Sequence, residues 1–247
     1  MKVLFSPSET KTSRLYAPPI GENSFVFPHL YPKRSEVLHR YTSLLESTSS
    51  EDLQKLFGIK DSENLRNRLT QTPSDRLTCK AIERYDGIAY DYLSYATLDE
   101  QVQAWLGENV MIFSNLFGPI LAHDFIPEYK LQQGETLGGF KPESFYKAYF
   151  SDALTSWIGD DTVLDLRAGF YEKFYTLNKP YITMKFLKKG KVISHFAKAY
   201  RGIVLRHVAR VQPKDEADFS TIPFEGLRIV EIHQSRLKRE YVCEIID

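Results

Sequence analysis

Lys198 and Arg201 stand one helical turn apart in the stretch 194–207, and together they could bind an anion. The window around them, residues 173–214, holds eleven Lys and Arg but no Asp or Glu. The whole chain has 32 basic and 32 acidic residues, so about five acids would be expected in 42 residues. A neutral protein that concentrates positive charge in this way is predicted to bind something anionic there.

The order of the elements strengthens this prediction. A strand ending near Phe196 is followed directly by a helix predicted over 197–211, whose first turn carries unpaired amide donors and a partial positive charge. Lys198 lies in that turn, so the helix amides and the cations could bind the same anion. Gly202 costs about 1 kcal/mol relative to Ala inside a helix, which indicates a need for close approach. Arg206 is predicted to lie away from the apolar face. The alternative is a solvated basic face, with Gly202 serving tight helix packing.

Other motifs for chemistry are absent from the sequence. There is no Walker loop, no Gly-x-Gly-x-x-Gly and no Gly-x-Ser-x-Gly. The six His show no metal-ligand spacing and the two Cys have no partner nearby, so neither a metal nor a cofactor is predicted. No apolar run reaches about 18 residues, and no signal peptide is recognisable. We expect a monomeric cytoplasmic protein without a membrane span.

The pattern of apolar residues predicts one compact domain, 1–247, of the mixed α/β (α+β) class. Strands are expected at 2–6, 109–113 and 162–166, with hairpins at 181–196 and 227–246. Helices are expected from Ser35 onward and at 75–98, 100–106, 142–157 and 197–211. In the helix at 142–157 the predicted buried face holds Phe145, Tyr149, Ala153 and Trp157. The segment 114–121 is expected to be a loop or short turn after a strand. The order of elements indicates a mixed central sheet with helices on both faces.

Residues 50–70 carry a second candidate for phosphate binding. A short helix, a Leu-Phe-Gly-Ile turn and a second helix give the outline of a helix-hairpin-helix, in which the amides of Gly58 and Ile59 could meet a phosphate. The alternative is an ordinary helical hairpin in which Gly58 is a left-handed C-cap.

Four segments in the same order resemble the YaaA family of peroxide stress proteins. Residues 196–202 are similar to its Tyr-Ala-Lys-x-Ala-Arg-Gly motif, and 5–11 to its Ser-Pro-x-Lys loop. Residues 85–90 are similar to its Phe-x-Gly-x-Val-Tyr segment, and 114–134 to its Ser-Gly-Leu-Tyr-Gly segment with the Asp and Pro-Tyr-Arg-Leu that follow. The departures are a displaced lysine (Lys11), Asn115 for Gly, Lys130 for Arg and Tyr200 for Ala. The family's Asn-Leu-Ala-Ser-x-x-Tyr segment is replaced at 165–171, so its role there is open.

The resemblance implies protection from hydrogen peroxide, an unusual α/β fold with a helix-hairpin-helix and a positively charged cleft, and DNA binding. The leading hypothesis is therefore a DNA-binding oxidative-stress protein that prefers duplex or structured DNA with little sequence preference. Its phosphate contacts would come from Lys198, Arg201, Gly202, Arg206, Lys11, Lys130, Ser6, Ser114, Gly58 and Ile59.

Two rival hypotheses stay open. Loops at Ser6, Ser114 and Asp165 could converge with Lys198 and Arg201 in a pocket, as in an enzyme acting on a nucleotide or nucleic-acid base. Alternatively, the basic window binds an acidic partner protein. A basic window scattered over several faces of the fold would weaken both of the sharper hypotheses.

Overall fold

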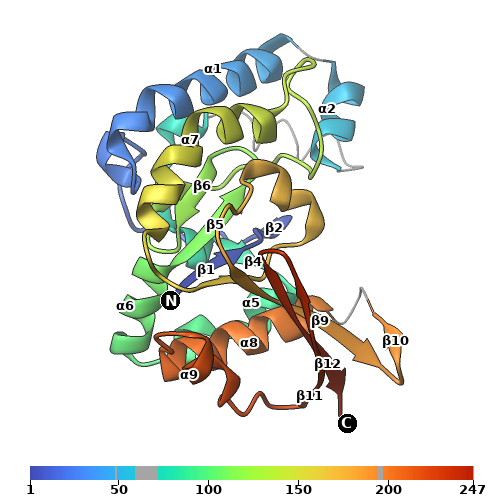
Figure 1. The fold of residues 1–247 in the computed structure, drawn as a ribbon. Helices are drawn as coiled ribbons and strands as arrows, with labels where there is room; N and C mark the ends of the chain where they lie inside the picture. Colours follow the sequence, from blue (N-terminus) through green and yellow to red (C-terminus); the bar gives the residue numbers. More distant parts are fainter. Residues whose placement is uncertain (48, 59–71, 194–196, 247) are drawn as a thin grey trace.

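The chain is built around a mixed β-sheet whose central strands run parallel (Figure 1). The structure is a computed structural model, and it describes residues 1–47, 49–58, 72–193 and 197–246. In this part of the chain the sheet has eight strands, in the order β11-β12-β9-β8-β1-β5-β6, with β10 paired to β9. Their bounds are Lys2–Phe5 (β1), Val110–Ser114 (β5), Gly118–Leu121 (β6), Val163–Asp165 (β8), Tyr181–Lys188 (β9), Lys191–Val192 (β10), Leu227–Ser235 (β11) and Lys238–Ile245 (β12).

The first strand occupies the middle of the sheet. β1 pairs in parallel with β5 on one side and with β8 on the other, and the parallel series continues through β9 to β12. β6, β10 and β11 are antiparallel to their neighbours. β5 is buried along its whole length, as expected for a parallel strand covered on both faces. The predicted strands and, within the described residues, both predicted hairpins are confirmed.

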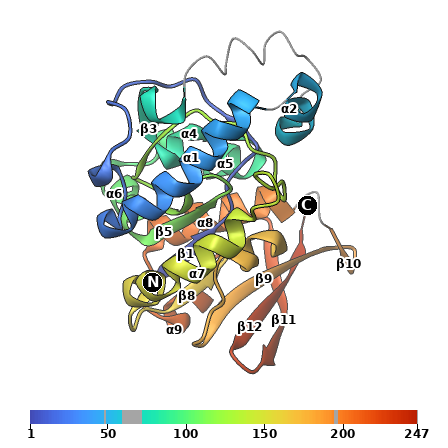
Figure 2. The same ribbon diagram turned by 90° about the horizontal axis from the view of Figure 1, so that it is seen from above.

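Helices cover both faces of the sheet. Figures 1 and 2 show α1 (Tyr31–Ser47) and α7 (Pro142–Ile158) on one face, and α5 (Ile88–Leu93), α6 (Glu100–Asn109) and α8 (Ala197–Val211) on the other. All layers share one hydrophobic core, so the chain forms a single compact domain of the predicted mixed α/β class. The remaining elements are α2 (Ser50–Phe57), α4 (Ala81–Arg84), α9 (Glu216–Ser220), β2 (Thr10–Lys11), β3 (Thr78–Lys80), β4 (Tyr85–Asp86), β7 (Phe125–Pro127) and the 3-10 turns η1 (Glu22–Ser24), η2 (Pro28–Leu30), η3 (Pro73–Asp75), η4 (Tyr95–Thr97) and η5 (Gly169–Phe174).

The helix α7 has the predicted bounds within one residue, but the predicted buried face is wrong. The buried side chains are Tyr146, Phe150, Leu154 and Ile158, one position along from the predicted set. Aromatic residues occupy both 145–146 and 149–150, so two neighbouring faces satisfied the helical period equally well. The outer pair, Phe145 and Tyr149, pack on each other with ring centroids 4.6 Å apart.

The single helix predicted at 75–98 is also wrong. That segment forms β3, α4, β4 and α5 in succession, because β3 pairs with β7 and β4 pairs with β2. The buried Arg84 fixes this arrangement by donating to the carbonyls of Arg14 (2.7 Å) and Ile126 (3.3 Å). Gly87 starts α5 with φ of +119°, a conformation that favours glycine.

Two further corrections concern α1 and β6. α1 begins at Tyr31 rather than at Ser35, with Pro32 in its first turn, where a missing N–H costs nothing. The segment expected to be a loop after β5 contains β6, which pairs back onto β5. The fully buried Arg34 links these two regions, because it donates to the carbonyls of Phe117 and Pro119 at the start of β6.

The helix-hairpin-helix prediction falls partly on residues that the structure describes. α2 is its first helix, and Gly58 follows in the left-handed region with φ of +61°. This is the geometry of a helix C-cap, and the amide of Gln132 donates to Leu56 O at 3.0 Å beside it. Ile59 and the second predicted helix lie outside the described residues.

Candidate functional site

The loop after β1 forms one wall of a cleft at the carboxyl ends of the parallel strands. The neighbours of β1 lie on opposite sides of it and are reached by separate crossovers, and such a switch point is where open α/β sheets bind ligands. This cleft, which we call the loop cleft, has a volume of about 280 Å³. It is lined by residues 5–10, by the start of α5 (87–90), and by Gln133, Ala168, Tyr171, Lys198 and Arg201. The structure thus brings Ser6 together with Lys198 and Arg201.

Lys11 and Lys130 hold the loop of this cleft from behind. Lys11 Nζ donates to the carbonyls of Ser8 (3.1 Å) and Glu9 (3.3 Å), and Lys130 Nζ donates to the same Glu9 carbonyl (3.2 Å). The Glu9 carboxylate accepts from the amide of Gln133 at 2.8 Å. Neither lysine lines the loop cleft, so both position its wall, whereas the prediction had them contact the ligand.

Burial perturbs the ammonium group of Lys11. It lies 4.2 Å from the centre of the Tyr129 ring. Desolvation is the main cause that lowers the pKa of Lys11 to about 7, and the positive charge of Lys130 lowers it further, while Glu9 opposes the shift. Such a shifted lysine beside a cleft is typical of functional sites.

The two serines predicted at strand ends have different positions. Ser6 Oγ accepts from the amide of Ala168 at 2.8 Å, which fixes the hydroxyl at the loop cleft. Ser114 is fully buried beneath it and does not line the loop cleft. Its Oγ lies 2.8 Å from the Tyr129 hydroxyl and accepts from the amide of Phe117 at 2.9 Å. Ser114 therefore stabilises the turn between β5 and β6.

Arg206 and Gly202 serve the packing of α8 on α5. Arg206 Nη1 donates to the carbonyls of Leu93 (2.7 Å) and Ser94 (3.0 Å), which caps the last turn of α5. A Cβ at Gly202 would lie 2.0 Å from Ala89 O, so only glycine allows the two helices to approach this closely. Gly202 thus fits tight helix packing. Arg206 does not line the loop cleft, whereas the prediction had it bind phosphate there.

The positive charges of the acid-free window do not gather in one place. Lys179 donates to the carbonyls of Gly159 and Asp161, both at 2.8 Å, just before β8 begins. Lys188, Lys189 and Lys191 lie at the β9–β10 turn, and Arg210 is exposed in the last turn of α8. Within the described part of the window, Lys198 and Arg201 are the basic residues that line the loop cleft.

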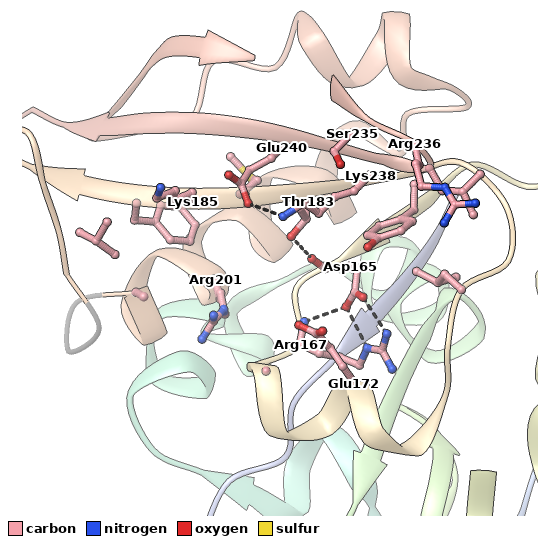
Figure 3. A pocket seen from close by; sticks show the side chains of 18 of the residues that line it. Asp165, Arg167, Glu172, Thr183, Lys185, Arg201, Ser235, Arg236, Lys238 and Glu240 are labelled. Atoms are coloured by element: carbon pink, nitrogen blue, oxygen red, sulfur yellow. Dashed lines mark hydrogen bonds and ion pairs between the residues drawn. The ribbon is translucent and has the colours of Figure 1, made fainter. Parts of the chain in front are cut away.

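A second and larger cleft lies beside the first (Figure 3). This sheet cleft has a volume of about 700 Å³ and is lined by β9, the β11–β12 turn, η5, the end of β8 and the start of α8. Asp165 and Arg167 form a buried ion pair in it, with Nε–Oδ1 at 2.9 Å and Nη2–Oδ2 at 2.7 Å. Arg167 also donates to Tyr175 O at 2.9 Å. The sequence did not predict this pair, although 165–171 stands out as a departure from the family motif.

Arg201 is the side chain that the two clefts share. Its guanidinium has no hydrogen bond or ion pair to any residue that the structure describes. Desolvation lowers its pKa, and the negative charges of Asp165 and Glu172 oppose this. A partly buried, unpaired cation at the start of a helix is well placed to receive an anion.

The comparison with known proteins agrees with the family resemblance found in the sequence. The model of the family described as "Peroxide stress protein YaaA" matches residues 1–233. The chain belongs to this family. A Campylobacter jejuni protein is 46% identical over 250 residues, covering all of both chains. UPF0246 proteins of Corynebacterium glutamicum and Streptomyces coelicolor are 34% and 29% identical, covering 85% and 83% of this chain and 85% and 82% of their own lengths.

Membership of the YaaA family supports a role in the peroxide stress response.

Two further features of the structure concern metals and membranes. The described residues hold no group of three or more His, Cys, Asp or Glu side chains placed to bind a metal ion. Among the helices that the structure describes, none has both the length and the hydrophobicity needed to cross a bilayer.

Proposed function

We propose that this YaaA-family protein binds DNA in the peroxide stress response, through phosphate contacts in the loop cleft. The observation that carries the proposal is the meeting of Lys198 and Arg201 with the Ser6–Thr10 loop in one cleft. α8 supplies the two cations from its first turns, where the helix amides add a partial positive charge. A phosphate oxygen bound there would accept hydrogen bonds from the Arg201 guanidinium, which has no partner among the described residues.

The charge arrangement in the loop cleft supports phosphate over a less specific anion. Glu9 is the acidic residue among those lining it, and its carboxylate is already bonded to the amide of Gln133. The two cations Lys198 and Arg201 thus outnumber the single carboxylate among the lining residues, and the rest of the lining is neutral. Such contacts hold a nucleic-acid backbone in place but carry no sequence information, so we expect little sequence preference and strong salt dependence.

The buried Lys11 behind the loop cleft supports a second candidate, an enzyme acting on a nucleotide or nucleic-acid base. A volume of about 280 Å³ is close to the lower limit for small-molecule sites. Lys11, with its pKa near 7, lies directly behind the loop and would be a candidate acid–base group if the loop moved. Turnover of a nucleotide that is abolished in Lys11→Met but retained in Lys130→Met would favour this candidate.

The test of DNA binding is a salt series with single-stranded and duplex oligonucleotides. The variant Lys198→Ala/Arg201→Ala is compared with Arg210→Ala, which removes an exposed cation from the other end of the same helix. We expect the double variant to lower affinity at least tenfold. It should also reduce the slope of log affinity against log salt by about 0.9 for each duplex phosphate that the variant no longer neutralises. Arg210→Ala should behave like the wild type. Unchanged binding by the double variant would remove the loop cleft as the binding site.

A further inference from the structure

The sheet cleft has the size of a small-molecule site and opens next to the proposed phosphate contact. Its volume of about 700 Å³ lies within the range of roughly 300–1,000 Å³ that is usual for ligand pockets. Arg201 stands at the boundary, so a phosphate bound to Arg201 would have the loop cleft on one side and the sheet cleft on the other. The rest of the ligand that carries this phosphate would enter the sheet cleft.

The charges in the sheet cleft fall into paired and unpaired groups. Asp165 is paired with Arg167, and Glu240 with Lys238 at 2.9 Å. Four charged side chains that line the cleft have no hydrogen bond or ion pair to any described residue: the cations Arg201, Lys185 and Arg236, and the carboxylate of Glu172. Figure 3 shows Arg201 and Glu172 on one wall and Lys185 on the facing strand β9. The cleft therefore offers an anion site with a free hydrogen-bond acceptor beside it.

The unpaired carboxylate limits what the anion can belong to. A second phosphate next to Glu172 would be repelled, so a diphosphate or a continuing strand is disfavoured on that side of Arg201. A hydroxyl or amino group fits beside Glu172, because it can donate a hydrogen bond to the carboxylate. Tyr181 and Val192 line the same cleft, are not buried, and offer apolar surface to a flat ring.

We propose that the sheet cleft binds the nucleoside part of a single nucleotide whose phosphate lies on Arg201. The sugar hydroxyls or the amino group of the base would donate to Glu172, and the base would pack on the apolar wall. This proposal rests on the proposed function in one respect, because it takes Arg201 as a phosphate contact. The nucleotide is either a free nucleoside monophosphate or the terminal unit of a nucleic-acid strand.

The test is calorimetric titration of the full chain with adenosine monophosphate, adenosine, ribose 5-phosphate and inorganic phosphate. We expect the monophosphate to bind at least tenfold tighter than inorganic phosphate. Glu172→Gln should weaken the monophosphate about tenfold, the loss of a hydrogen bond to a charged group, without weakening inorganic phosphate. Glu100→Gln, which removes an exposed carboxylate on α6, is the matched control. Equal affinity for monophosphate and phosphate, no binding of either, or an unchanged Glu172→Gln variant would overturn the proposal.

Two further measurements complete the test. The first distinguishes a free nucleotide from a strand terminus, and the second distinguishes this proposal from the proposed function. A circular strand can compete for Arg201 only from the loop cleft, so much stronger displacement by a linear 5′-phosphorylated strand of the same sequence would identify a strand terminus. Equal displacement by the two strands would identify a free nucleotide. Lys198 lines only the loop cleft of the two, so Lys198→Ala should reduce DNA affinity and leave monophosphate binding unchanged. DNA binding that persists while monophosphate binding fails would contradict the sheet-cleft proposal alone.

Discussion

The loop cleft and the sheet cleft share Arg201 but are built in different ways. The loop cleft is assembled from short backbone segments that are far apart in the sequence and are held in place by Lys11, Lys130 and the packing of α5 on α8. The sheet cleft is lined by side chains of β9 and the β11–β12 turn, with charges of both signs. Backbone groups and cations suit the phosphates of a nucleic-acid backbone. Paired charges with one free carboxylate suit a ligand that carries both a phosphate and hydrogen-bond donors. One arginine can therefore serve two parts of the same ligand.

The largest expected effect concerns the buried ion pair in the wall of the sheet cleft, for which the loop cleft has no counterpart. Asp165→Ala leaves Arg167 buried without its carboxylate, and loss of one member of a buried ion pair costs about 3–5 kcal/mol. Urea unfolding would measure this loss. The double variant Asp165→Leu/Arg167→Met should recover a large part of it, because no charge remains buried. If the double variant is less stable than the single one, the pair is not the source of the effect.

A smaller effect should fall on the loop cleft. Gly202→Ala places a Cβ 2.0 Å from Ala89 O, so α5, which lines that cleft, must move. Overpacking of this kind costs about 1–3 kcal/mol. We expect thermal unfolding to show the loss and DNA affinity to fall more than monophosphate affinity. Gly21→Ala is the control, since no atom lies within 4 Å of the added Cβ there. Equal stability of the two variants would contradict the proposed packing role.

The smallest effect concerns the lysine behind the loop. The pKa of Lys11 falls from 10.5 to about 7 on folding, so between these values the unfolded chain binds more protons than the folded chain. Stability therefore rises with pH above 7. We expect a gain of about 0.5 kcal/mol per pH unit relative to Lys11→Met, below the limit of about 1.4 kcal/mol for one proton. Urea unfolding from about pH 6 to about pH 9.5, a range that brackets most of the shift, tests this. Parallel curves for the two proteins would mean that Lys11 stays charged.

The part of the fold that sequence predicts best is the part whose burial is unambiguous. The apolar runs of β1, β5 and β8 and the helix α8 follow from local pattern. Residues 75–98 do not, because β3 and β4 are strands only through pairing with β7 and β2, which lie elsewhere in the sequence. The face of α7 was ambiguous because aromatic residues occupy adjacent positions on it.

The site shows the same division. Ser6, Lys198 and Arg201 could be chosen from sequence because strand ends and a helix start predict where they gather. Arg206 could not be placed, since the helical period gives its direction but not that the end of α5 lies there. The Asp165–Arg167 pair and Glu172 become a ligand site only when β9 and β12 form the opposite wall.

The central position of β1 has a consequence for how the chain folds. Val3 pairs with Val110, and Lys2 pairs with Val163, so the first strand to be synthesised meets its two neighbours only much later. Pairings of such sequence separation slow folding, and a strand without its partners exposes unpaired backbone groups at its edges and apolar side chains on its faces. During translation β1 can therefore pair with β5 only after about residue 112 has left the ribosome, and its other edge stays unpaired until β8 follows. We expect this protein to depend on chaperones while it is being made, which places a cost on synthesis under the oxidative conditions in which its family acts.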